Sequence, residues 1–89
     1  MAITGCTSYE GLSVQQHDDV FDVFKQFLLD IKPARILEIG TAGGGLTLFF
    51  RDILPNTPIL TFEVYDQPWY DRLRENNIDV RIENIFNHA

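Results

Sequence analysis

The chain has 89 residues, which is enough for one small domain. Its formal net charge of −6 argues against nucleic acid or an anionic membrane surface as a general partner. No apolar run approaches the roughly 20 residues that a membrane span needs, and the first residues lack a signal-peptide pattern. The single cysteine, Cys6, excludes an internal disulfide and a zinc site built from cysteines. We therefore predict a soluble, cytoplasmic protein that has no membrane partner.

The N-terminal part is predicted to contain an arm and a long helix. Residues 1–12 show no hydrophobic periodicity and are interpreted as an irregular arm. Ser13 and Gln16 have the spacing of a capping box, which predicts a helix over residues 14–31. Its apolar residues recur at three- and four-residue spacing and are expected to pack in the core: Val20, Phe21, Phe24, Phe27, Leu28 and Ile31.

The remaining chain alternates between strand and helix patterns. Strands are predicted at 35–39, 59–64 and 78–82, and helices at 46–54 and 69–76. With right-handed crossovers the strands form a parallel sheet in the order 3-2-1. The predicted fold class is α/β, with residues 13–89 forming a single half-domain: half of a doubly wound, Rossmann-like sheet. The first strand then has an open edge, so we expect self-association or a partner that covers it.

The turn after the first strand contains the most informative residues. Residues 38–45 read Glu-Ile-Gly-Thr-Ala-Gly-Gly-Gly and lie between the first strand and the next helix. Glycines at such a turn let a ligand approach backbone amides at a helix N-terminus. A phosphate-binding loop would gain nothing from the carboxylate of Glu38, whereas a ligand with a cationic amine would be stabilised by it.

This turn resembles motif I of the class I S-adenosylmethionine-dependent methyltransferases, which reads acid-x-Gly-x-Gly-x-Gly. Glu38, Gly40 and Gly44 match the motif, and Ala42 replaces its middle glycine. The variant looks most like the branch that contains the cephalosporin hydroxylase-like and sugar O-methyltransferase-like proteins. The upstream pattern of that branch, aromatic-x-Gly…Gln…Asp, is similar to Tyr9, Gly11, Gln15 and Asp18. The resemblance covers most of this chain but only the first half of the family's fold.

The resemblance implies an S-adenosylmethionine cofactor and methyl transfer to a small molecule. It implies that Glu38 orients the amino group of the cofactor, that Glu63 accepts hydrogen bonds from both ribose hydroxyls, and that Val64 flanks the adenine. The turn under the methionyl part and the ribose consists of Gly40, Thr41, Ala42, Gly43 and Gly44. The family acid that follows the third strand is absent, and Asn84 lies in its neighbourhood. No catalytic residue can be assigned, because the family's acceptor-binding and metal-binding residues lie beyond this half.

Other interpretations remain open. The spacing of Gly40, Ala42 and Gly45 also fits a dinucleotide-binding fingerprint, which would indicate a NAD-dependent oxidoreductase fragment, although Glu38 disfavours a pyrophosphate. The glycines could also serve only to pack a helix close to a strand. A non-catalytic nucleoside-binding or assembly module and a truncated chain without its own function are further alternatives. No metal site is predicted, because His17 and His88 are interpreted as solvated side chains.

Overall fold

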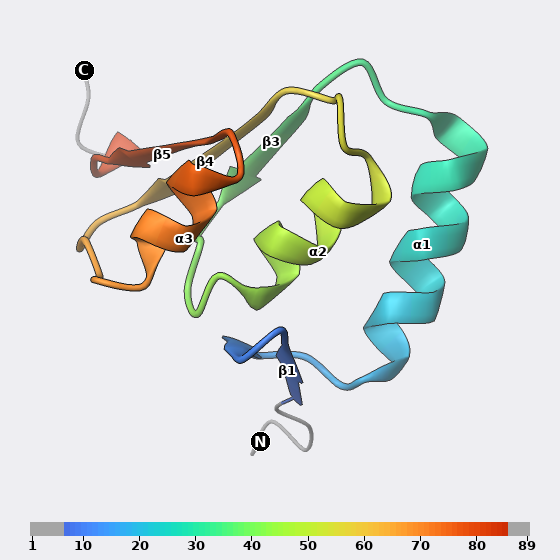
Figure 1. Ribbon diagram of the computed structural model, residues 1–89, viewed down its shortest axis with the longest axis horizontal. Helices are drawn as coiled ribbons and strands as arrows, with labels where there is room; N and C mark the ends of the chain where they lie inside the picture. Colours follow the sequence, from blue (N-terminus) through green and yellow to red (C-terminus); the bar gives the residue numbers. More distant parts are fainter. Residues whose placement is uncertain (1–6, 86–89) are drawn as a thin grey trace.

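The structure is a computed structural model that describes residues 7–85. Cys6, His88 and the start of the predicted arm lie outside this range. The elements in chain order are β1 (Thr7–Tyr9), β2 (Leu12–Val14), α1 (Asp19–Ile31), β3 (Ile36–Ile39), α2 (Gly45–Ile53), β4 (Ile59–Glu63), α3 (Tyr70–Glu75) and β5 (Ile78–Ile82) (Figure 1). The predicted α/β class, with a parallel sheet and helices, is confirmed. No helix formed by the described residues is both long and apolar enough to cross a membrane.

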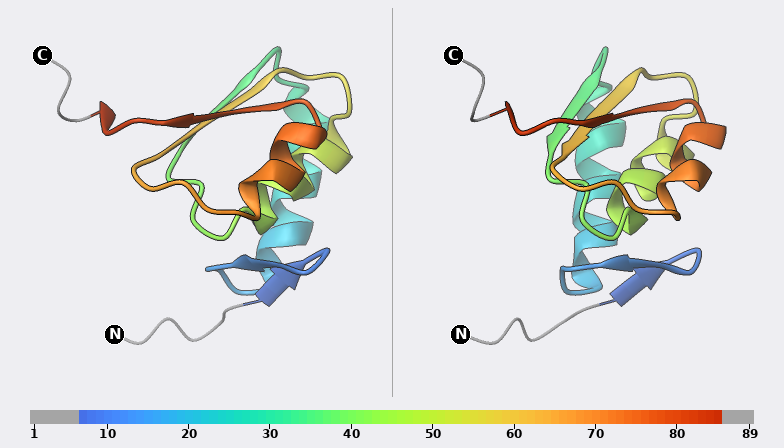
Figure 2. Two further views of the ribbon diagram at one scale, coloured as in Figure 1. Left: turned by 60° about the vertical axis from the view of Figure 1, so that its left-hand side comes forward. Right: turned by 90° about the vertical axis from the view of Figure 1, so that its left-hand side faces the viewer.

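The three-stranded sheet has the order β3-β4-β5, and both pairings are parallel. Ile36 of β3 lies opposite Ile59 of β4, which lies opposite Ile78 of β5. Helices α2 and α3 cover one face of this sheet, and α1 packs beside α2 (Figure 2). Because side chains alternate along a strand, the other face carries Leu37 and Ile39, both of which are exposed.

The core lies between the sheet and α2. Leu48, Phe49 and Phe50 of α2 are buried there. Aromatic rings from the N-terminal part contact this helix: the ring centroids of Phe21 and Phe49 lie 5.0 Å apart, and those of Phe24 and Phe50 lie 5.2 Å apart. These contacts hold the N-terminal elements against the half of the chain that contains the glycine turn.

The interpretation of residues 1–12 as an irregular arm is wrong for the described residues 7–12. They form β1, a turn and the start of β2, an antiparallel hairpin in which Thr7 pairs with Val14. Glu10 and Gly11 take positive φ angles of 51° and 84°, as a two-residue hairpin turn requires. The side chain of Tyr9 donates a hydrogen bond of 2.5 Å to Asp52 of α2. The hairpin is therefore anchored on the sheet-covering helix.

The predicted start of the first helix is also wrong. The helix begins at Asp19 rather than at residue 14, because Val14 is buried as part of β2. Ser13 forms no capping interaction there and instead packs against Gly43. Core packing is confirmed for Phe21, Phe24 and Leu28, but it is wrong for Phe27 and Ile31, which are half exposed. Local spacing could not show which side of an amphipathic helix the rest of the fold covers.

Candidate functional site

The turn between β3 and α2 has an unusual backbone conformation. Gly40, Ala42 and Gly44 all have positive φ angles, of 91°, 51° and 84°. The amide of Gly40 donates a hydrogen bond of 2.8 Å to the carbonyl of Phe62 in β4, so the turn begins at the carboxyl end of the sheet. A side chain at Gly40 would meet open space, and glycine is needed there for its backbone conformation alone.

Two other glycines of this turn are covered by the hairpin. A β-carbon at Gly43 would lie 1.9 Å from the hydroxyl oxygen of Ser13, and one at Gly45 would lie 2.5 Å from the carbonyl oxygen of Leu12. The prediction that the missing side chains admit a ligand to the helix N-terminus is therefore wrong for these two positions. They admit strand β2, whose backbone lies against the start of α2.

Two pockets lie on either side of a crest formed by Ala42, which is exposed, and Gly43, which is half-buried. The Glu38 pocket, of about 290 Å³, is lined by Ser13, Val14, Gln15, Gln16, Glu38, Gly40, Thr41, Ala42, Gly43 and Leu46. The Glu63 pocket, of about 300 Å³, is lined by Ser13, Gln15, Ala42, Gly43, Glu63, Tyr65, Gln67, Trp69 and Tyr70. The pockets share four residues, so they are neighbouring compartments, each with one carboxylate in its wall.

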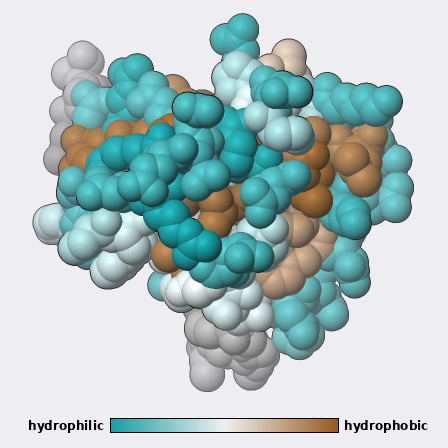
Figure 3. All heavy atoms as spheres, viewed as in Figure 1, coloured by the Kyte–Doolittle hydropathy of each residue, from teal (hydrophilic) through white to brown (hydrophobic). Residues whose placement is uncertain are grey.

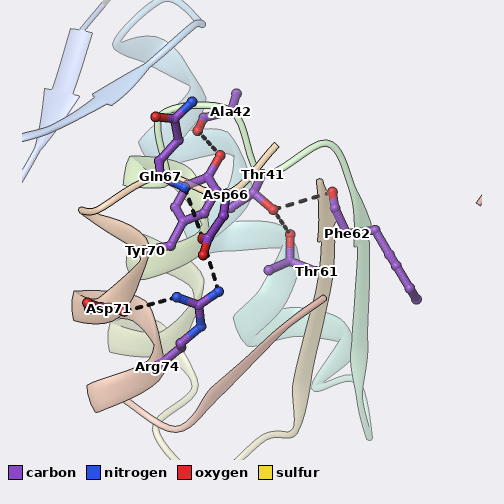
Figure 4. A network of polar contacts seen from close by, with 9 residues as sticks. All are labelled: Thr41, Ala42, Thr61, Phe62, Asp66, Gln67, Tyr70, Asp71 and Arg74. Carbon is purple, nitrogen blue, oxygen red and sulfur yellow. Dashed lines mark hydrogen bonds and ion pairs between the residues drawn. The ribbon is translucent and has the colours of Figure 1, made fainter. Parts of the chain in front are cut away.

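Glu38 lies at the boundary between the core and its pocket. Its Oε1 atom accepts hydrogen bonds from the hydroxyl of Thr47, at 2.5 Å, and from that of Thr61, at 2.7 Å. Since Thr61 donates its only hydroxyl hydrogen to Glu38, the hydroxyl of Thr41 is the donor in the 2.6 Å contact between the two threonines, and it shares this hydrogen with the carbonyl of Phe62 at 3.3 Å (Figure 4). This chain of hydroxyls fixes Oε1 and leaves Oε2 available to a ligand.

The environment of Glu38 favours its neutral form. Burial raises the pKa of this carboxyl, the threonine hydrogen bonds lower it in part, and the charge of Glu63 raises it further. A cationic group bound in the Glu38 pocket would oppose this effect, because an opposite charge stabilises the carboxylate.

Glu63 is held by backbone amides at the end of β4. Its Oε1 accepts a 2.9 Å hydrogen bond from the amide of Ala42, and its Oε2 accepts one of the same length from the amide of Val64. Each carboxylate oxygen has two lone pairs, so both oxygens can still accept a hydrogen bond from a ligand. The arrangement therefore presents two acceptors side by side in the Glu63 pocket.

Tyr70 holds the crest from its other side. Its hydroxyl donates a hydrogen bond to the carbonyl of Ala42 (Figure 4), so the amide and the carbonyl of this residue are both engaged. Burial, followed by the negative charge of Glu63, raises the pKa of Tyr70 to about 12, which keeps the phenol protonated as a donor. These bonds stabilise a non-glycine residue in a left-handed conformation that is otherwise unfavourable.

The structure brings most of the predicted site residues together, with two exceptions. Glu38, Gly40, Thr41, Ala42, Gly43 and Glu63 line one or both pockets. Gly44 faces the core, since a β-carbon there would contact Leu73, and Val64 lines neither pocket with its side chain.

Several pocket residues have no role in the sequence-based assignment of the site. Ser13 and Gln16 have the spacing of a capping box, and Trp69 and Tyr70 begin a predicted helix, but all four line a pocket. Gln15 does so too, and the only signal for it was its place in the upstream pattern of the resembled family.

The start of α1 contains a second group of potential ligand atoms. One atom each from His17, Asp18 and Asp19 lie within 4.8 Å of one another, and all three residues are exposed. The Nδ1 atom of His17 already accepts a hydrogen bond from the amide of Asp19. A helix N-terminus also carries a partial positive charge that disfavours a cation. We assign no metal site to this group.

Comparisons of the chain with protein-family models, curated proteins and solved structures find no match.

Proposed function

We propose that the chain binds S-adenosylmethionine across the crest of Ala42 and Gly43, as the cofactor-binding part of a methyltransferase-like protein that acts on a small molecule. The observation that carries the proposal is the placement of two carboxylates, Glu38 and Glu63, in two neighbouring pockets. The cofactor has a cationic amine at one end and a ribose with two neighbouring hydroxyls toward the other. Each pocket offers an acceptor suited to one of these groups.

The amine is assigned to the Glu38 pocket. Oε1 of Glu38 is fixed by Thr47 and Thr61, so Oε2 can accept a charge-assisted hydrogen bond without reorganising the side chain. The ribose is assigned to Glu63, whose two oxygens are oriented by the amides of Ala42 and Val64. In the doubly wound fold we propose, this is the ligand-binding end of the parallel sheet.

The same geometry disfavours a dinucleotide. A pyrophosphate binds where the amides of a helix N-terminus are accessible, and here β2 lies against the start of α2 at Gly43 and Gly45. The carboxylate of Glu38 would also repel its negative charges, whereas Glu63 suits the ribose of either ligand and does not distinguish them.

We propose cofactor binding without assigning turnover to these residues. Methyl transfer depends mainly on alignment of the acceptor with the methyl group. Among residues 7–85 we identify no group that would bind or deprotonate an acceptor. As partners we propose a small-molecule ligand and a second copy of the chain, and as location the cytoplasm, which suits a chain with one cysteine.

Calorimetric titration of the 89-residue chain with S-adenosylmethionine tests the proposal. We expect saturable binding that Glu63→Ala weakens at least about tenfold, because hydrogen bonds to a charged group contribute roughly 1.5–3 kcal/mol each. Glu75→Ala removes the same charge from an exposed site on α3 and should leave the affinity unchanged. Tighter binding of NAD, or no binding by a folded sample, would contradict the proposal.

A further inference from the structure

The segment that follows β2 crosses the junction of the two pockets. Ser13 and Gln15 line both of them, whereas Gln16 lines only the Glu38 pocket. The hydroxyl of Ser13 packs directly on Gly43, so this side chain is committed to the scaffold. Gln15 is exposed, and no hydrogen bond to another described residue occupies its side-chain amide. It is therefore the side chain of this segment that is free to contact a ligand at the junction.

We propose that Gln15 contacts the middle of the bound cofactor, at its positively charged sulfur. This inference rests on the proposed function. If the amine lies at Glu38 and the ribose at Glu63, the atoms that join them cross the crest of Ala42 and Gly43, where Gln15 lies. A sulfonium has no hydrogen to donate, but the carbonyl oxygen of a carboxamide carries a partial negative charge that stabilises a nearby cation.

The proposal gives Gln15 a role that neither carboxylate can have. S-adenosylmethionine and S-adenosylhomocysteine, the compound left after methyl transfer, share the amine and the ribose and differ at the sulfur. Glu38 and Glu63 therefore contact groups that both compounds possess. A residue at the junction contacts the atom that differs, so Gln15 determines how well the chain distinguishes the two compounds.

The test measures the affinity of the 89-residue chain for both compounds in variants at two adjacent positions. Gln15→Glu should raise the preference for S-adenosylmethionine over S-adenosylhomocysteine about fivefold, as expected for a full charge near a sulfonium in a largely hydrated site. Gln16→Glu adds the same charge one residue away. Gln16→Glu should change the affinities for the two compounds by the same factor, because Gln16 lines only the Glu38 pocket, to which we assign the amine that both compounds share.

The outcomes separate this inference from the proposed function. If the wild-type chain binds both compounds and Gln15→Glu leaves the preference unchanged, the role of Gln15 is wrong and the proposed function stands. If Gln16→Glu changes the preference as much as Gln15→Glu does, the role of Gln15 is also wrong, because a long-range electrostatic effect would then explain both variants. If the folded wild-type chain binds neither compound, the proposed function fails and this inference fails with it. Circular dichroism spectra of all variants control for folding.

Discussion

Arg51 places a permanent charge in the interior and has no ion-pair partner among residues 7–85. The side chain is 8% exposed, and its guanidinium donates to five backbone carbonyls. Three belong to the loop before β4 and two to the turn before β5: Leu54, Pro55, Thr57, Asn76 and Asn77. The planar group with five N–H donors suits this role, which lysine could not fill. Arg51 therefore joins the two loops that lead into β4 and β5.

We expect Arg51→Met to lower the free energy of unfolding by about 3 kcal/mol, because the substitution leaves several carbonyls without a donor. Urea denaturation measures the change. Arg81→Met is the control, since Arg81 is a half-exposed arginine paired with Asp79, and its loss should leave the free energy of unfolding nearly unchanged. Equal losses in the two variants would show that the carbonyl contacts of Arg51 do not stabilise the fold.

The ionised carboxylate of Glu38 should favour ligand binding and lower the stability of the folded chain. Its pKa is raised above the ordinary 4.5, mainly by burial, so folding favours the protonated form. The resulting stability is fully present below pH 4.5 and is lost as the pH rises through the pKa of the folded state. Glu38→Gln keeps an acceptor for Thr47 and Thr61 without the charge.

We therefore expect Glu38→Gln to be more stable than the wild-type chain at pH 7 and equally stable near pH 4. Its affinity for S-adenosylmethionine should fall at least about tenfold, because the charge-assisted bond to the amine is lost. Thermal denaturation at the two pH values and calorimetric titration measure these effects. A variant that is less stable at pH 7 would show that the ionised carboxylate supports the fold.

At the scale of the elements, the hairpin and the start of α2 depend on the absence of a side chain at Gly43. Its φ angle is not positive, so alanine would cause no backbone strain there. The added β-carbon would lie 1.9 Å from the hydroxyl oxygen and 2.5 Å from the backbone carbonyl oxygen of Ser13. Since the second contact is with backbone, the strand itself has to move.

We expect Gly43→Ala to cost about 1–3 kcal/mol of stability and to reduce the hydrogen-exchange protection of residues 7–14. Gly40→Ala is the matched control. Its β-carbon meets open space, and the positive φ angle should cost about 1–2 kcal/mol without releasing the hairpin. Loss of hairpin protection in both variants would contradict a specific role for Gly43.

The same elements show what the sequence could and could not predict. The three strands of the parallel sheet were visible because each is a short apolar run between turn residues, which is a local signal. The contact of Ser13 with Gly43 joins positions 30 residues apart, and no local pattern indicates it. Without that contact, Ser13 and Gln16 fit a helix cap and the glycines fit an open ligand turn. Glu38 and Glu63 were indicated by the resemblance to the methyltransferase motif, and both lie near the carboxyl ends of parallel strands, which meet at one edge.

For the whole molecule, two apolar surfaces remain uncovered within the described residues. One is the sheet face with Leu37, which is 62% exposed, and the other is a stripe on α1 with Val23 and Phe27, the latter 52% exposed. Apolar side chains also interrupt the polar surface in Figure 3. A helix stripe packing on a sheet face is the common way to bury both.

A second copy of the chain can supply the missing surface, with α1 of each copy on the sheet face of the other. Charge favours this arrangement. Asp30 borders the helix stripe, and Arg35 lines the apolar groove beside Leu37 on the sheet face. Arg35 has no ion-pair partner among residues 7–85, so it is available to the acidic helix of the second copy.

We expect a concentration-dependent dimer in analytical ultracentrifugation, weakened at least about tenfold by either Phe27→Glu or Leu37→Glu, because each variant buries an unpaired charge in both contacts. An equimolar mixture of the two variants should dimerise more tightly than either alone. In the mixed dimer one contact has both substitutions, and the other joins an intact helix to an intact sheet face. Tyr65→Glu adds the same charge to an exposed residue that lines the Glu63 pocket, outside both surfaces, and should leave the dimer unchanged. A mixture that associates no better than its components would show that the helix and the sheet face do not contact each other.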